Sequence, residues 1–246
     1  MLQSHDILGV IPSRMASTRF PGKPLAMIGG LPMVIRVYRQ ASQVLPCVVI
    51  AGCDPEVEAA ARQYGAAYVG TGTGHDSGTS RCLEALRIHS ALTGKSFRAV
   101  INIQGDEPMV SEECLSLLKA DISRAEIGIS TLVRPETDPG EFSNPNRVKV
   151  VTDGNGNALY FSRSPIPYYR SGGSAWLAHI GMYAFKTEVL ERIMQLPPDP
   201  LELAESLEQL RWLGHGFPVH CCPTGYRGFG IDTPEDLEKL VNSGLI

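Results

Sequence analysis

Side chains suited to binding phosphate cluster in one loop near the N-terminus. Arg14, Arg19 and Lys23 follow the apolar run 7–11, and Gly22 directly precedes the lysine. Backbone N–H groups and fixed cations on a loop after a strand can surround phosphate oxygens. The P-loop pattern G-x-x-x-x-G-K-[ST] is absent, because Lys23 follows a single glycine and precedes a proline. The loop therefore predicts a triphosphate site that is not a P-loop ATPase site.

Two acidic turns could hold a metal ion. Asp106 lies in the segment INIQGDEP, directly after an apolar run, and Asp232 lies in GFGIDTPEDL, before a helical pattern. Mg²⁺ prefers carboxylate and phosphate oxygens, so both residues are candidate ligands. The alternatives are a solvated acidic turn at Asp106 and a turn-supporting role at Asp232. We interpret Asp236 as a helix N-terminal charge.

Several more polar groups have both a functional and a structural interpretation. In GHDSGTSR, hydroxyl groups and Arg81 could contact a base or a ribose, but an ordinary Ser/Thr helix cap explains the same residues. A structural role is also the alternative for several polar residues beside apolar elements: Arg163, His179, Glu205, Glu208 and Gln209.

Alternating strand and helix patterns position these residues in the first hundred positions. Strands are predicted at 7–11, 47–52, 66–70 and 99–104, with helices at 33–44, 55–64 and 79–91. This order favours a parallel sheet covered by helices on both faces. Ligands of such sheets bind beyond the carboxyl ends of the strands, so the loop 12–23 and the turn 104–107 are expected to share one crevice.

The rest of the chain has a mixed pattern. Strands are predicted at 128–133, 148–152, 158–162 and 179–185, with helices at 189–194, 203–213 and 234–241. The turn Asp153-Gly154-Asn155-Gly156-Asn157 is a hairpin signal. No linker or repeat interrupts the sequence, which predicts a single domain over 1–246.

The composition of the chain limits the classes of molecule that it is expected to bind. The 246 residues carry a net charge of −4 and no basic cluster, which disfavours binding to nucleic acid. No apolar run approaches the roughly 18 residues of a membrane span, and the first residues lack a signal-peptide pattern. We expect a cytoplasmic protein that binds a small nucleotide and no membrane.

The ordered series of segments resembles one family along nearly the whole chain. These segments are VIPSRMASTRFPGKPL, HDSGTSR, INIQGDEP, NPNRVKVV, ALYFSRSPIP, HIGMYAF, LEQLR and GIDTPEDLEKL. The sequence is similar to the 3-deoxy-manno-octulosonate (Kdo) cytidylyltransferases. The resemblance implies a Rossmann-like nucleotidyltransferase fold of class α/β, a three-layer sandwich with a mixed, mainly parallel sheet. It also implies Mg²⁺-dependent transfer of CMP from CTP to Kdo, with release of pyrophosphate, for lipopolysaccharide or capsule synthesis.

The resemblance further assigns roles to residues at matching positions. It implies a homodimer, with a mixed-strand dimerisation and sugar-pocket region around 128–185. Arg14 and Lys23 would bind the CTP phosphates in a loop lined by Ser13, and Asp106 and Asp232 would hold Mg²⁺; these four charged residues are the catalytic candidates. The implied base or ribose contacts are Ser77, Thr79, Arg81 and Gln104, and the implied sugar-acid contacts are Arg163, His179, Tyr183, Glu208 and Gln209.

One departure from the family pattern leaves more than one sugar acid as a candidate substrate. Ser80 stands where the family usually has an acidic residue, so a close analogue such as an amino-substituted Kdo is an alternative substrate. Two competing hypotheses for the function are a CMP-sialate-type synthetase and a non-catalytic nucleotide-binding protein. A non-catalytic protein would be expected to lack Lys23, Asp106 or Asp232, and all three are present.

Overall fold

A computed structural model of the chain describes residues 2–17, 19–228 and 230–244. The chain forms two compact units. The N-terminal unit contains residues 2–116 together with 228–246, and the central unit contains residues 117–227. The expectation of a single domain over 1–246 stays a prediction.

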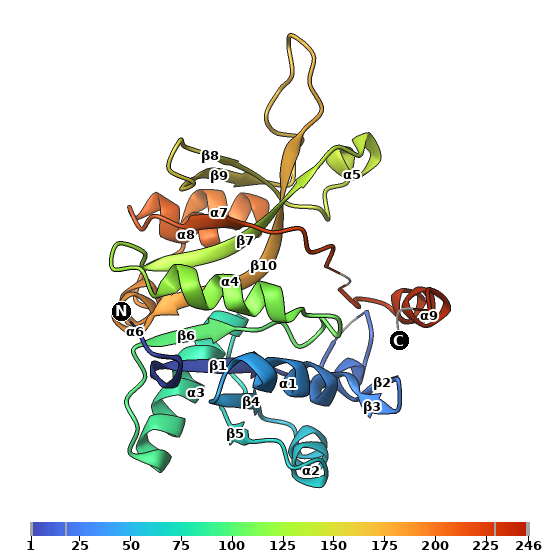
Figure 1. Ribbon diagram of the computed structural model, residues 1–246, viewed down its shortest axis with the longest axis vertical. Coiled ribbons are helices and arrows are strands. Elements are labelled where there is room, and N and C mark those ends of the chain that lie inside the picture. The colour runs from blue at the N-terminus through green and yellow to red at the C-terminus, as the bar shows by residue number, and fades with distance from the viewer. Residues whose placement is uncertain (1, 18, 229, 245–246) are drawn as a thin grey trace. The chain divides into compact units, whose positions relative to one another are not determined.

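The N-terminal unit is built on four parallel strands in the order β6, β1, β4, β5 (Figure 1). Their bounds are Ala99–Asn102, Ile7–Pro12, Val48–Gly52 and Tyr68–Gly70. All residues of β4 and β6 are buried, as are Ile7 to Ile11 of β1. Burial on both faces explains why these strands appear in the sequence as continuous apolar runs. The predicted parallel sheet is confirmed.

Helices cover both faces of this sheet (Figure 1). The connections β1-α1-β4 and β4-α2-β5 progress in one direction, through α1 (Met33–Val44) and α2 (Pro55–Gln63). The connection from β5 to β6 returns across β4 and β1 through α3 (Gly78–Thr93). Since such crossovers are right-handed, α3 lies on the opposite face from α1. The strand order therefore reverses between β1 and β6, which is where open α/β sheets bind their ligands.

Close packing of α1 on the sheet requires a glycine in β1. A Cβ atom on Gly9 would lie 2.8 Å from Leu45 Cδ1 and 3.2 Å from Val48 Cγ2. Any side chain here would push the end of α1 away from the strands. Gly9 thus fixes how the strand that leads into the phosphate loop packs.

Short elements complete the N-terminal unit. They are η1 (Ser4–Asp6), η2 (Lys23–Leu25), the hairpin β2 (Met27–Ile28) and β3 (Leu31–Pro32), and α9 (Pro234–Asn242). The boundary between the units falls within α4 (Glu112–Ile122), a helix that the sequence patterns did not predict.

The central unit contains a mixed sheet. Strand β7 (Ile129–Glu136) pairs antiparallel with β10 (Trp176–Lys186) and parallel with β11 (His220–Pro223). Strand β8 (Lys149–Thr152) pairs antiparallel with β10 and with β9 (Ala158–Ser162). The hairpin predicted at residues 153–157 joins β8 and β9, and Asp153 accepts hydrogen bonds from the backbone N–H groups of Asn155 and Asn157. The predicted mixed second half is confirmed.

The helices of the central unit correct one prediction. They are α5 (Pro139–Ser143), α6 (Thr187–Ile193), α7 (Pro200–Glu205) and α8 (Gln209–Gly214). The single helix predicted at 203–213 is wrong, because Ser206 adopts a left-handed conformation with φ +52° and separates α7 from α8. A non-glycine residue rarely takes this conformation, so apolar periodicity alone does not reveal the break.

Candidate active site

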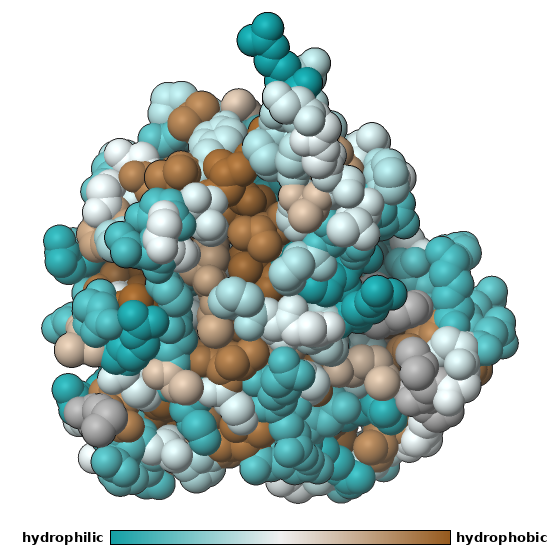
Figure 2. All heavy atoms as spheres, turned by 45° about the horizontal axis from the view of Figure 1, so that its top comes forward, coloured by the Kyte–Doolittle hydropathy of each residue, from teal (hydrophilic) through white to brown (hydrophobic). Residues whose placement is uncertain are grey.

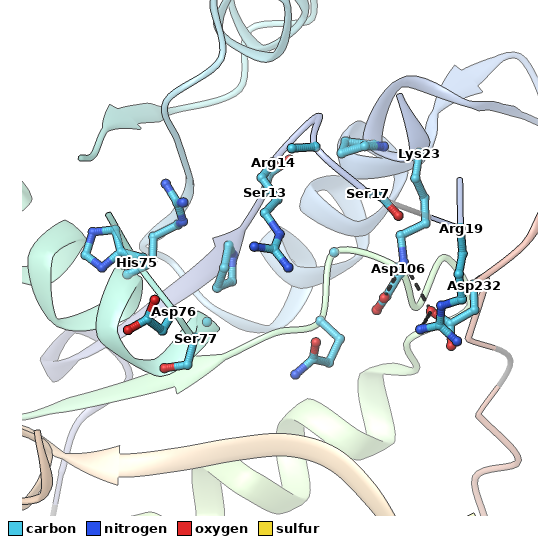
Figure 3. A pocket seen from close by; sticks show the side chains of 17 residues that line it. Ser13, Arg14, Ser17, Arg19, Lys23, His75, Asp76, Ser77, Asp106 and Asp232 are labelled. Carbon is cyan, nitrogen blue, oxygen red and sulfur yellow. Dashed lines mark hydrogen bonds and ion pairs between the residues drawn. The ribbon is translucent and has the colours of Figure 1, made fainter. Parts of the chain in front are cut away.

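A cavity of about 600 Å³ opens at the carboxyl ends of β1 and β6, and all of its lining residues belong to the N-terminal unit (Figure 3). The phosphate loop, the turn after β6 and the start of α3 form its walls, with Asp232 at one side. The predicted crevice shared by residues 12–23 and 104–107 is therefore confirmed. The predicted residues that line it are Ser13, Arg14, Lys23, Ser77, Arg81, Gln104, Asp106 and Asp232. Thr79 is buried within the first turn of α3 and does not line the cavity.

Backbone hydrogen bonds hold the phosphate loop in shape. The N–H of Ser13 donates to Ala51 O at 2.8 Å, and the N–H of Met15 donates to Asp54 Oδ2 at 2.9 Å. The loop closes where the N–H of Gly22 donates to Met15 O at 3.2 Å. Gly22 has φ +75°, a conformation that favours glycine. These contacts place Lys23 at the start of η2, beside the cavity.

The side chain of Ser13 is a polar group with no partner in the described residues. It is 6% exposed, its Oγ is buried without a hydrogen bond, and it lines the cavity. Since buried hydroxyl groups are normally hydrogen-bonded, this atom is available to a bound molecule.

The residues predicted for phosphate and for metal form one ion-paired cluster (Figure 3). Lys23 Nζ lies 2.7 Å from Asp106 Oδ2 and 3.4 Å from Asp232 Oδ1. Arg19 Nη2 lies 3.0 Å from the same Asp232 oxygen. The structure thus brings Asp106 and Asp232 together, with the Lys23 ammonium as the cation between them.

A backbone contact brings Asp232 to Asp106. The N–H of Ile231 donates to the carbonyl of Asp106 at 2.9 Å, which joins segments 125 residues apart in the sequence. Ile231 is fully buried in an apolar cluster with Ile28, Met33 and Leu240, against which Phe20 of the phosphate loop packs. The same cluster therefore supports the phosphate loop and the segment that carries Asp232.

A helix cap fixes the turn after Asp232. Asp236 accepts from the backbone N–H groups of Asp232 and Thr233, and Thr233 Oγ1 accepts from the N–H of Asp236. This capping box starts α9 immediately behind the aspartate. The interpretation of Asp236 as a helix N-terminal residue is confirmed.

The carboxylate pair fits Mg²⁺ bound together with phosphates. In the ranges that the structure describes, no group of three or more His, Cys, Asp or Glu side chains could hold a metal ion. Mg²⁺ is commonly held by one or two carboxylates, with water and substrate phosphate oxygens as the other ligands. The donor set of Asp106 and Asp232 is of this kind, and the ammonium between them shows that the position favours a cation.

Arg14 and Arg81 have different environments. Arg14 is exposed at the cavity, and within the described residues it forms no ion pair. Arg81 is 4% exposed, and its Nη1 donates to Thr71 Oγ1 at 2.6 Å and to Gly72 O at 3.2 Å. Arg81 therefore lines the cavity while it also ties the loop after β5 to α3.

The residues predicted for the sugar acid all lie in the central unit. Arg163 donates from Nε to Glu205 O at 2.7 Å and from Nη1 to Pro145 O at 3.1 Å, with Nη2 3.4 Å from Ser206 O. Its own N–H donates to Glu205 Oε2. The guanidinium thus holds the turn between α7 and α8, so the structural interpretation of Arg163 is supported.

His179 and Tyr183 share one aromatic cluster on β10. Their ring centroids are 5.4 Å apart, and the ring of Tyr183 also packs against Trp212 of α8. His179 Nε2 lies 2.9 Å from Thr131 Oγ1, and burial lowers the pKa of His179 to about 3. Burial, reinforced by the charge of Glu208, raises the pKa of Tyr183 well above its usual value. Both side chains are therefore neutral at physiological pH.

A β-bulge sets the spacing of this cluster. His179 pairs with Val133 and Ile180 with Leu132, but the next pair joins Tyr183 to Thr131. The extra residues in β10 re-aim the side chains around His179 and Tyr183. Tyr183 Oη is buried and has no hydrogen-bond partner in the described residues, and Gln209 at the start of α8 is 5% exposed.

Sequence reasoning missed the contacts of one lining residue, His75. The ring lies between Ser80 and Glu84 of α3. The signal was present, because His75 belongs to the segment GHDSGTSR. Its partner Glu84 lies one helical turn beyond Ser80, on the same face.

Comparisons with known proteins place the chain in a family. The sequence pattern of the family described as cytidylyltransferase matches residues 8–218. The 3-deoxy-manno-octulosonate cytidylyltransferase of Parabacteroides distasonis is 46% identical over 245 residues, covering 95% of this chain and 96% of the relative. The protein of the same name from Bacteroides thetaiotaomicron is 46% identical over 241 residues, covering 94% and 95%.

A solved structure agrees with these relatives. A CMP:2-keto-3-deoxy-manno-octonic acid synthetase complexed with CTP has a TM-score of 0.88 and is 38% identical, covering 96% of this chain and 97% of its own. A cytidylyltransferase from Leptospira borgpetersenii, 18% identical, shares the fold with a TM-score of 0.63. The expected Rossmann-like nucleotidyltransferase fold is thus confirmed. The chain belongs to the 3-deoxy-manno-octulosonate cytidylyltransferase family.

Proposed function

We propose that the protein transfers CMP from CTP to the anomeric hydroxyl of Kdo, or of a close analogue such as an amino-Kdo, and releases pyrophosphate. The observation that carries this proposal is the cavity in which Arg14, Arg19 and Lys23 lie beside the carboxylates of Asp106 and Asp232. Such a site can bind a triphosphate and a divalent cation together. The relatives and the CTP-bound solved structure support the choice of CTP and Kdo.

In the proposed reaction, the anomeric oxygen attacks the α-phosphorus of CTP. A new O–P bond forms, the bond from the α-phosphorus to the bridging oxygen breaks, and the hydroxyl proton passes to water. Negative charge develops on the leaving pyrophosphate, so charge neutralisation and positioning are the main catalytic contributions. Arg14 and Lys23 supply fixed positive charge for the phosphates, and Ser13 Oγ can donate a hydrogen bond to them.

Asp106 and Asp232 would hold Mg²⁺ at the edge of the cavity. Bound Mg²⁺ supplies Lewis-acid charge neutralisation on the phosphate oxygens. Lys23 then has to leave the carboxylates, and the triphosphate offers its ammonium a new anionic partner. Ser77, Arg81 and Gln104, which also line the cavity, are the proposed contacts for the cytosine and ribose, and Thr79 is proposed to support them from within α3.

The sugar acid is proposed to contact residues of the central unit. His179, Tyr183, Glu208 and Gln209 gather around β10 and the start of α8, and the unpartnered Tyr183 Oη offers a donor to a sugar hydroxyl. Arg163 is proposed to act mainly by holding the turn around Ser206 in place.

We also propose that two copies of the chain associate. Figure 2 shows apolar side chains gathered on the face in view, and the central unit exposes several large apolar residues: Leu159, Tyr168, Leu201 and Leu203. Exposed apolar surface of this kind often marks an interface. Light scattering after size exclusion tests the homodimer.

Across the described residues no helix is long and apolar enough to span a bilayer. We propose a cytoplasmic location, and cell fractionation tests it.

The decisive experiment measures pyrophosphate release from CTP with Kdo, an amino-Kdo and sialic acid, with and without Mg²⁺. Turnover with a Kdo-type acid that requires Mg²⁺ is expected. Turnover with sialic acid alone would favour a CMP-sialate-type enzyme, and binding of CTP without any turnover would favour a non-catalytic protein. Equal activity with ATP or UTP would remove the cytosine contacts assigned to Arg81 and Gln104.

A further inference from the structure

The wall of the cavity formed by the start of α3 depends on a network of side chains around His75. The His75 ring lies in the loop between β5 and α3, and its side chain is 16% exposed. Its Nδ1 is 3.0 Å from Ser80 Oγ, and its Nε2 is hydrogen-bonded to Glu84 Oε2. Both ring nitrogens therefore have partners on α3.

The direction of one of these hydrogen bonds follows from the chemistry of the partner. A carboxylate has no hydrogen to donate, so Glu84 Oε2 accepts from Nε2–H of His75. Ser80 Oγ, which lies 2.9 Å from the carbonyl of Ser77, is the partner of Nδ1 on the other side of the ring.

The state of Glu84 agrees with this assignment. The hydrogen bond from His75, followed by that from the N–H of Gly72, lowers the pKa of Glu84. The distance from Gly72 N to Glu84 Oε2 is 2.8 Å. The carboxylate is thus held in its charged form by two donors from the same loop.

The same loop is tied to α3 a second time. Arg81 donates to Thr71 Oγ1 and to the carbonyl of Gly72, so both backbone polar groups of Gly72 are bound by side chains of α3. His75, Asp76 and Ser77, which follow, lie along the cavity (Figure 3). Their positions depend on how firmly this loop is held.

We propose that His75 is a positioning residue of the nucleotide site: its hydrogen bond to Glu84 holds the loop 71–77 against α3 and thereby positions Ser77, Gly78 and Arg81 for the nucleotide. This inference takes the identity of the ligand from the proposed function. The attachment of the loop to α3 does not depend on that function. Ser80 contributes a neutral acceptor. An acidic residue at this position would add a second negative charge beside the His75 ring.

Two measurements on the full chain test, without any ligand, whether His75 and Glu84 hold the loop against α3. Hydrogen exchange of residues 71–77 is expected to rise about tenfold in His75→Ala and in Glu84→Gln, with the rest of β4, β5 and α3 unchanged. Nitrogen NMR of the His75 ring is expected to show a hydrogen on Nε2 in the wild type, and the Nε2 signal should shift in Glu84→Gln, which changes its hydrogen-bond partner. Glu58→Gln, which removes an exposed carboxylate paired with Arg62 on α2, is the matched control. Unchanged exchange, or an Nε2 signal that does not respond to Glu84→Gln, would overturn the proposal.

Nucleotide binding provides the functional test. Calorimetry is expected to show that His75→Ala binds CTP about tenfold more weakly than the wild type. Steady-state kinetics should show a KM for CTP about tenfold higher, with kcat changed less than threefold. The double variant His75→Ala/Glu84→Gln should be no worse than either single variant, because both remove the same pair. Additive losses in the double variant would contradict a shared role. If the wild type does not bind CTP at all, the proposed function fails, while the exchange and NMR experiments still test the attachment of the loop to α3.

Discussion

Lys23 and the proposed metal ion compete for the same two carboxylates, and this competition can be measured. The Lys23 ammonium lies 2.7 Å from Asp106 and 3.4 Å from Asp232, with Arg19 as a further cation on Asp232. A divalent cation that binds Asp106 and Asp232 has to displace the ammonium. Replacement of Lys23 by methionine keeps a long apolar side chain and removes the charge.

The size of the effect follows from the exposure of the partners. The side chain of Lys23 is 15% exposed, that of Asp106 31% and that of Asp232 47%. Because solvent screens such a pair, we take the upper value for exposed ion pairs, about 1 kcal/mol, and not the larger value of a buried pair. Without nucleotide, Lys23→Met should therefore bind Mn²⁺ about fivefold more tightly than the wild type, since 1.4 kcal/mol corresponds to tenfold.

Titration of free Mn²⁺ by electron paramagnetic resonance gives this affinity directly. CTP should strengthen Mn²⁺ binding in the wild type, because the phosphates offer Lys23 another partner, and should strengthen it less in Lys23→Met. Lys95→Met, which changes an exposed lysine in the loop after α3, is the charge-matched control. Equal Mn²⁺ affinities for the wild type, Lys23→Met and Lys95→Met would refute the competition.

Three further predictions concern the metal site, the central unit and the docking of α9. Asp106→Asn should lower kcat about 100-fold by misplacing the reacting groups, and pyrophosphate release at saturating Mg²⁺ checks this; near-normal turnover would remove Asp106 from the metal site. The pKa of His179 in the folded protein is about 3, below its value in the unfolded chain. Between about pH 6.5 and pH 3 the unfolded chain therefore binds one proton more than the folded protein does. The free energy of unfolding should fall as the pH drops through this range, by up to about 1.4 kcal/mol per pH unit. Urea unfolding at pH 7 and pH 5 should show this loss in the wild type and a smaller loss in His179→Gln, and parallel losses would contradict the assignment. Leu240→Ala removes a fully buried side chain and should lower the free energy of opening α9 by about 2–5 kcal/mol, read from hydrogen exchange of residues 234–242; unchanged exchange in this helix would contradict its docking through Leu240.

The sequence predicted the elements that have a strong local pattern. The buried strands of the N-terminal unit are continuous apolar runs, and α1 has the predicted bounds Met33–Val44. Because parallel strands end at one edge of a sheet, residues after β1 and β6 could be placed together without any structure. Strand β11 was missed, because His220 and two cysteines lack a clear alternation and the strand gains its stability from pairing with β7.

The contacts of the site were harder to predict than its members. Asp106 and Asp232 were recognised as candidate ligands, but nothing in their local sequence shows that the N–H of Ile231 binds the carbonyl of Asp106. The ion pair of Lys23 with these residues depends on the same long-range contact. Similarly, the break at Ser206 depends on tertiary support for a left-handed conformation, which periodicity does not record.

The contact between Ile231 and Asp106 also links the proposed metal site to the stability of α9. Leu240 is the single residue of the short helix α9 that is fully buried among those described, so α9 has little to hold it beyond the apolar cluster and its cap. A segment of this kind opens at a lower free energy than the sheet does. When α9 detaches, Asp232 leaves with it and the carboxylate pair is broken, although β1, β4 and β6 remain folded. Mild denaturant or heat should therefore abolish turnover before the circular dichroism of the helices and strands changes.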